Sequence, residues 1–261
     1  MNIRPRTLRN PRLWVGWMVL VSGCTAQPPS VATAYNEAPT HAADQQYANL
    51  GHQYLLRGSF DLAEVRLQHA IHLNPNLPAA HHDLAVAYGE LGNLEAADKE
   101  YRIALELLPT DPTVLYHYAT LLYNQGRYSE AETRLQAVLA TPSAEECAPA
   151  YEALGRIALK NQEDSKAEGY FKKTLESAPN SPHSLLALAK INLHKNLLPL
   201  AQNYLQRYQS IAHDTPEGLW VGVLLARAQG DDTALAAQSQ RLRVKFPDSE
   251  EARQLYAERH H

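Results

Sequence analysis

Cysteine is almost absent from the 261-residue chain, which contains only Cys24 and Cys147. Two cysteines are too few for a disulfide-rich fold, and their separation does not fit a cysteine-based metal site. The chain also lacks the motifs GxxxxGK[ST], GxGxxG, HExxH and GxSxG, which are typical of nucleotide, metalloprotease and hydrolase sites. We therefore expect neither an enzyme nor a bound cofactor.

Long hydrophobic runs are also missing, apart from a short one near the N-terminus. Residues 1–23 contain four arginines and no acidic residue, followed by the apolar run from Leu13 to Val21 and by Ser22-Gly23. A membrane-spanning helix needs roughly 20 apolar residues, so this run is too short to be one. Its order of basic, apolar and small residues predicts a signal peptide at 1–23 that is removed.

The residues Val21-Ser22-Gly23-Cys24 resemble the bacterial lipobox, in which the cysteine is acylated and the peptide bond before it is cleaved. The resemblance implies lipidation of Cys24, and several acyl chains suffice for lasting anchorage. Thr25 stands where an aspartate would imply retention in the inner membrane. The resemblance therefore implies an anchor on the periplasmic face of the outer membrane; the alternative is a plain secretory signal followed by a chance cysteine.

Residues 24–43 are rich in small residues and proline and have no apolar periodicity, which predicts a flexible tether; the lipobox resemblance implies that it is lipidated at Cys24. At roughly 3.3 Å per residue, it would reach up to about 60 Å from the membrane surface. Removal of residues 1–23 would take away four arginines and no acidic residue, changing the formal net charge from −4 to −8. An acidic chain of this kind argues against nucleic acid as a partner.

From Asp44 the sequence repeats with a period of about 34 residues, the length of a tetratricopeptide helical hairpin. Tyr54 and Tyr88 are 34 residues apart, and so are Gly58 and Gly92. We predict six units and a C-terminal capping helix. The units are 44–77, 78–111, 112–147, 148–181, 182–215 and 216–249, and the cap is 250–261.

Small residues recur at matching places in both helices of these units, where they would let the helices approach closely. Hairpins of this kind cover their apolar sides only by stacking on their neighbours. The sequence therefore predicts an all-α fold, a right-handed superhelical solenoid of six tetratricopeptide hairpins with a concave face lined by the first helices. The small residues are Gly51, Ala85, Ala119, Gly155 and Ala189 on first helices, and Ala63, Ala97, Ala131, Ala167 and Ala201 on second helices.

Two stretches of sequence carry a more specific resemblance. TLLYNQGRYSEAE in the third unit, and EGLWVGVLLARAQGD followed by RLRVKFPDSEEARQL near the end, resemble the type IV pilus biogenesis lipoproteins of the PilF/PilW family. The resemblance covers about residues 44–255 together with the lipobox. It implies an outer-membrane scaffold, a pilotin, that helps the secretin assemble or localise and so supports pilus biogenesis and twitching motility.

One feature of that family is not present. Its members commonly have a cysteine in the first helix of the third repeat and another in the fourth, whereas this chain has Tyr123 and Ile157 at the matching positions. No disulfide is therefore implied here. Because the bridge is a stability feature, its absence leaves the implied binding role, with a secretin subunit as partner, unchanged.

The first helices supply the residues that we predict to bind a partner. An aromatic and histidine-rich groove can dock an extended or helical segment, and we expect roughly a third of its residues at most to carry the binding energy. Only Asn49 fits the pattern that grips a C-terminal carboxylate, so that mode is not expected. The predicted concave-face residues are Asn49, His52, His82, Asp83, Tyr116, His117, Thr120, Tyr123, Glu152 and Arg156, with Val86 beside them.

Other chemistry has little support in the sequence. The twelve histidines include no set of three or four with the spacing of zinc ligands, so no metal is expected. Cys147 follows two glutamates, a setting that disfavours the reactive thiolate. Trp220 is predicted to pack within the sixth hairpin. A different scaffold role stays open, namely an adaptor for periplasmic peptidoglycan hydrolases or for outer-membrane assembly machinery.

Overall fold

The computed structural model describes residues 40–141 and 147–257. Cys24, the predicted signal peptide and residues 258–261 of the predicted cap lie outside the described residues. Within these, every regular element is an α-helix. The helices are α1 Thr40–Leu56, α2 Phe60–Leu73, α3 Pro78–Glu90, α4 Leu94–Leu107, α5 Pro112–Asn124, α6 Tyr128–Ala140, α7 Cys147–Lys160, α8 Asp164–Ser177, α9 Pro182–His194, α10 Leu198–Ile211, α11 Pro216–Gln229, α12 Asp232–Lys245 and α13 Glu250–Ala257.

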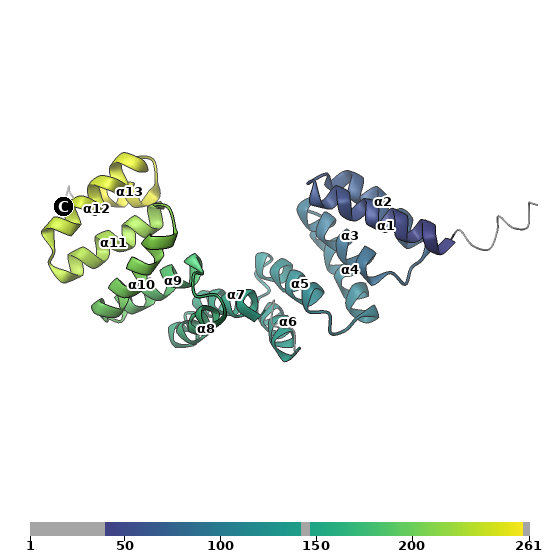
Figure 1. Ribbon diagram of the computed structural model, residues 1–261, viewed down its shortest axis with the longest axis horizontal. Coiled ribbons are helices and arrows are strands. Elements are labelled where there is room, and N and C mark those ends of the chain that lie inside the picture. Colours follow the sequence, from purple (N-terminus) through teal and green to yellow (C-terminus); the bar gives the residue numbers. More distant parts are fainter. Residues whose placement is uncertain (1–39, 142–146, 258–261) are drawn as a thin grey trace, which may run out of the picture. The chain divides into compact units, whose positions relative to one another are not determined.

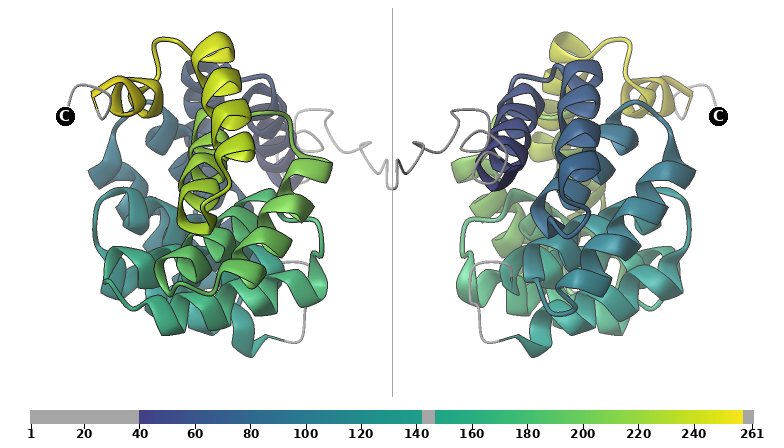
Figure 2. Two further views of the ribbon diagram at one scale, coloured as in Figure 1. Left: turned by 90° about the vertical axis from the view of Figure 1, so that its left-hand side faces the viewer. Right: turned by 90° about the vertical axis from the view of Figure 1, so that its right-hand side faces the viewer.

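Consecutive helices pair as hairpins, and the second helix of each hairpin packs against the first helix of the next (Figure 1). The last helix, α13, ends beside the C mark in Figure 2 and packs against α11 and α12. Each hairpin thus covers the apolar side of its neighbour. The predicted solenoid of six helical hairpins with a C-terminal helix is confirmed.

The small residues of the repeat allow this close packing. A Cβ atom on Gly51 would lie 2.5 Å from Cγ of Leu67, and one on Gly155 would lie 2.7 Å from Cε1 of Phe171. Neither distance leaves room for a methyl group. The predicted alanines of the second helices, Ala63, Ala97, Ala131, Ala167 and Ala201, are completely buried.

The turn inside each hairpin contains one residue with a positive φ, the left-handed region that glycine adopts at least cost. Two hairpins place a larger residue there, Gln162 with a φ of 62° and Asn196 with a φ of 57°. The same backbone turn is therefore kept even where the sequence has no glycine. The six residues are Gly58, Gly92, Gly126, Gln162, Asn196 and Gly230.

Two helix starts differ from the predicted unit boundaries. Helix α1 begins at Thr40, so residues 40–43, which the sequence analysis assigned to the tether, are helical. These four residues contain no glycine or proline, and alanine, which makes up half of them, is the strongest helix former. Helix α7 begins at Cys147, one residue before the predicted fourth unit.

Among the described residues, the packed core lies within the compact unit His41–His261. Five clusters of buried apolar side chains follow one another along it, and the last joins Leu219 and Leu242 to Leu255 of α13. The unit thus has a complete core of its own, and we expect it to fold without residues 1–40. Among the described helices, none has the length and apolar character needed to cross a bilayer.

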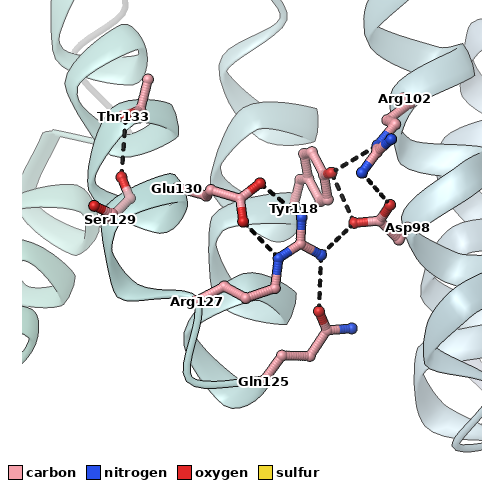
Figure 3. Close-up of polar contacts among 8 residues, drawn as sticks. All are labelled: Asp98, Arg102, Tyr118, Gln125, Arg127, Ser129, Glu130 and Thr133. Carbon is pink, nitrogen blue, oxygen red and sulfur yellow. Dashed lines mark hydrogen bonds and ion pairs between the residues drawn. The ribbon is translucent and has the colours of Figure 1, made fainter.

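A network of ion pairs and hydrogen bonds joins the second and third hairpins (Figure 3). Asp98 on α4 accepts a hydrogen bond from the Tyr118 hydroxyl at 2.8 Å and pairs with Nη1 of Arg127 at 2.7 Å. Figure 3 shows the Arg127 guanidinium between Asp98 and Glu130. A carboxylate oxygen of Glu130 lies 2.6 Å from Nη2 of Arg127. Burial alone would raise the pKa of Asp98, but these hydrogen bonds outweigh it and lower that pKa.

Candidate protein-binding surface

Four predicted site residues form a continuous polar row across α1, α3 and α5, which we call the histidine row. Nδ1 of His52 lies 2.9 Å from one Asp83 oxygen, and Nδ1 of His82 lies 3.3 Å from the other. On its far side, Nε2 of His82 lies 2.8 Å from Nδ1 of His117, and the two rings are stacked. Because a carboxylate only accepts, His52 donates its Nδ1–H to Asp83.

Four more predicted residues gather between α5 and α7. The Arg156 guanidinium lies 4.7 Å from the centroid of the Tyr123 ring, within the range of a cation–π contact. Tyr116 is half-buried; burial raises the pKa of its phenol, and the charge of Glu152 adds to this effect. Tyr116, Tyr123 and Arg156 line a cavity of about 60 Å³ together with Thr120, and we call it the α5–α7 socket.

A second cavity of about 280 Å³, the α3–α5 socket, lies beside the first. Its lining includes Val86, Glu90, Tyr101 and His117. Thr120 and Asn124 line both sockets, so the exposed edge of α5 separates them. Two partly apolar hollows are thus adjacent, one with a carboxylate in its lining and the other with a guanidinium.

Tyr101 is a site residue that the sequence analysis did not identify as one. It lies on the second helix α4 and is only 4% exposed, yet its ring lies 6.0 Å from that of His82 and it lines the α3–α5 socket. Burial raises the pKa of its phenol, with Asp83 and Glu90 adding to the shift. No pattern along the first helices could have identified Tyr101, because it comes from a second helix.

Two of the predicted residues line neither socket and are not part of the histidine row. Asn49 is exposed and accepts a hydrogen bond from Gln45 of its own helix at 3.1 Å. Glu152 accepts hydrogen bonds from Ser181 at 2.6 Å and Ser184 at 3.2 Å, so it holds the start of α9. Both therefore have local structural contacts, and the fourth hairpin contributes Arg156 to the surface.

The described residues contain no group of three or more histidine, cysteine, aspartate or glutamate side chains that could hold a metal ion. His52, Asp83 and His82 are in contact with one another as a line, an arrangement that does not surround one point. Trp220 is half-buried and packs against the last core cluster, as predicted from the sequence. The surface thus offers shape and hydrogen-bonding groups, which suit the binding of another macromolecule.

Family models and known proteins give consistent similarities. A model described as tetratricopeptide repeat matches residues 119–182, and one described as YpiA-like, C-terminal tetratricopeptide repeats matches residues 78–142. The type IV pilus assembly protein PilF of Pseudomonas aeruginosa PAO1 is 28% identical over 239 residues, which cover 92% of this chain and 94% of that protein.

Solved structures agree with these matches. A structure of Pseudomonas aeruginosa PilF aligns with a TM-score of 0.77 at 30% identity, covering 84% of this chain and 99% of the other. The crystal structure of PilW, described as a widely conserved type IV pilus biogenesis factor, aligns with a TM-score of 0.72 at 24% identity. It covers 82% of this chain and 98% of its own, and at that identity it supports the fold alone.

Proposed function

Because the chain belongs to the PilF/PilW-like family of tetratricopeptide-repeat proteins, we propose that it is a non-catalytic scaffold of the type IV pilus machinery. In this proposal it binds a secretin subunit and promotes its assembly or localisation. The solenoid holds the partner, and an acylated Cys24 keeps the complex at the periplasmic face of the outer membrane.

The pair of sockets on either side of α5 is the observation that carries this proposal. Their linings combine apolar side chains with Glu90 in one socket and Arg156 in the other. A peptide segment crossing the exposed edge at Thr120 can place one apolar side chain in each hollow and its polar groups against the histidine row. Such docking of alternate side chains is a common mode of peptide recognition.

Thr120 and Thr133 form a matched pair for testing this surface. Both are exposed threonines whose hydroxyl donates to the carbonyl four residues earlier at 3.0 Å. Thr120 lies on α5, whereas Thr133, with its bond to Ser129 drawn in Figure 3, lies on α6. In cells producing the full chain, Thr120→Lys is expected to reduce co-purification of the secretin at least ten-fold. Thr133→Lys should leave it unchanged, and equal recovery with both variants would contradict the proposal.

The membrane anchor has a separate test. Cys24→Ala removes the only thiol that the lipobox resemblance assigns to acylation, so the variant is expected in the soluble periplasmic fraction, with fewer secretin multimers and loss of twitching motility. Cys147→Ala serves as the control, since it should leave the protein in the outer-membrane fraction. Unchanged fractionation and unchanged secretin multimers in the Cys24 variant would refute the anchor.

The same purification decides between pathways. If this scaffold served the cell wall instead, the full chain would recover peptidoglycan hydrolases or outer-membrane assembly factors and Thr120→Lys would release them. Recovery of the secretin and its loss in the Thr120 variant supports the pilus role. Co-purification therefore identifies the partner, and its loss in the Thr120 variant identifies the surface that binds it.

A further inference from the structure

A separate cavity of about 630 Å³ lies between the first helices α9 and α11 and the C-terminal helix α13. Its apolar lining includes Trp220, Val221 and Leu224, and three carboxylates surround this lining: Glu217, Glu250 and Glu251. Cavities of 300–1,000 Å³ with apolar walls and a few polar groups are typical of ligand sites. None of these residues belongs to the sockets on α5.

The basic groups of this cavity are already engaged by carboxylates. Nζ of Lys190 lies 2.7 Å from Glu217, and Nδ1 of His194 lies 3.2 Å from Asp164 of a neighbouring helix. Glu251 is half-buried on α13, and its side chain has no hydrogen bond or ion pair among the described residues. Among the described residues that line the cavity, three carboxylates therefore stand against one lysine, which already pairs with Glu217.

Trp220 places an aromatic ring beside these carboxylates. One part of its half-buried indole packs against the last core cluster, while another part lines the cavity. Tryptophan is the best ring for binding a cation, and carboxylates form charge-assisted hydrogen bonds with a guanidinium. The interaction of first-turn glutamates with the dipole of α13 accounts for their charge at that place, but it does not account for the open cavity beside an indole.

We propose that this cavity binds a protein segment in which an arginine lies next to an aliphatic residue. The guanidinium lies against the Trp220 ring and pairs with Glu251, and the aliphatic side chain contacts Val221 and Leu224. Arginine fits better than lysine because its planar group can stack on a ring and bond to a carboxylate at once. The protein would thus hold two partners, or two segments of one partner, through different hairpins.

The chain offers a direct reporter for this proposal. Trp220 is the only tryptophan in the unit His41–His261, so the tryptophan fluorescence of that unit reports on the surroundings of this one side chain. The probe is the blocked tripeptide Leu-Arg-Leu, and its control is the same peptide with citrulline, the neutral isostere of arginine. A saturable fluorescence change is expected, with at least ten-fold weaker binding of the citrulline peptide and weaker binding of the arginine peptide as salt is raised.

Glu251→Gln keeps the shape of the side chain and is expected to weaken binding of the arginine peptide about ten-fold. Glu176→Gln on the exposed side of α8 is the matched control and should bind as the unaltered unit does. If Glu251→Gln does not fold, Glu250→Gln and the salt dependence provide the same comparison. Equal binding of the two peptides would instead indicate that the cavity takes a purely apolar ligand. Self-association that requires Trp220 would indicate that a second copy of this chain occupies it. Either result, or no binding of the arginine peptide, would overturn the proposal.

Discussion

Replacement of Gly155 by alanine tests the packing on which the solenoid depends. Gly155 lies in α7, and a Cβ there would be 2.7 Å from Cε1 and 2.8 Å from Cζ of Phe171. Phe171 is 1% exposed, so its ring cannot move into solvent. Gly169 in α8 is the matched control, because a Cβ at that position meets no atom within 4 Å.

The two substitutions have the same effect on helix propensity but differ in their effect on packing. Each replaces a helical glycine with alanine, which favours the helix by about 1 kcal/mol. Gly155→Ala alone also forces an extra methyl group into a filled space, which typically costs about 1–3 kcal/mol. We therefore expect Gly169→Ala to stabilise the protein and Gly155→Ala to be less stable than it by about 2 kcal/mol.

Urea denaturation of the unit His41–His261 followed by circular dichroism measures this difference. An unchanged slope for both variants would show that the midpoints report on native-state stability. For a unit of this size, about 2 kcal/mol corresponds to a difference in melting temperature of roughly 4–8 °C. Equal midpoints for the two variants would refute the claim that the absence of a side chain at Gly155 sets the distance between α7 and α8.

Other predictions concern charge and backbone conformation. Nδ1 of His81 lies 2.6 Å from Glu100, and Nε2 lies 2.9 Å from the Pro75 carbonyl oxygen. Burial would lower the pKa of His81, but these bonds outweigh burial and raise the pKa above 6.5. The stability that His81 contributes is therefore complete below pH 6.5 and is lost as the pH rises through the raised pKa. In the His81→Gln variant, the midpoint of urea denaturation should depend less on pH above pH 6.5. The pKa of Asp98 is lowered, so its contribution to folding stability is present above about pH 4 and is lost as the pH falls. Asp98→Asn should therefore lower the free energy of unfolding by about 1–2 kcal/mol at neutral pH and make the stability less sensitive to acid. Gln162→Gly should raise the melting temperature, because φ is positive there.

The repeat period made the fold predictable. Residues 34 positions apart occupy equivalent places in most successive hairpins, so the pattern located the small residues at the close helix contacts. The start of α1 was less predictable, because residues 40–43 lie before the first repeated position. Their helical structure precedes the buried Asp44, which accepts a hydrogen bond from Asn74 at 2.9 Å, a tertiary contact that no local pattern reveals.

The candidate surface was predictable only in part. The same period placed His82 and His117 on neighbouring first helices, and the structure brings their rings together. It could not show that Tyr101 of a second helix reaches the same socket, or that Glu152 is used by the start of α9. These outcomes depend on the distances between helices and on local caps, which side-chain spacing along one helix does not define.

The proposed scaffold role of the α5 surface is tested most directly by photo-crosslinking in living cells. A photoreactive phenylalanine analogue at Thr120 samples the edge between the two sockets, and the same residue at Thr133 samples the exposed side of α6. We predict that the Thr120 position crosslinks to the secretin and the Thr133 position does not. Crosslinks from Thr120 only to proteins outside the pilus machinery, or equal secretin crosslinks from both positions, would contradict the account.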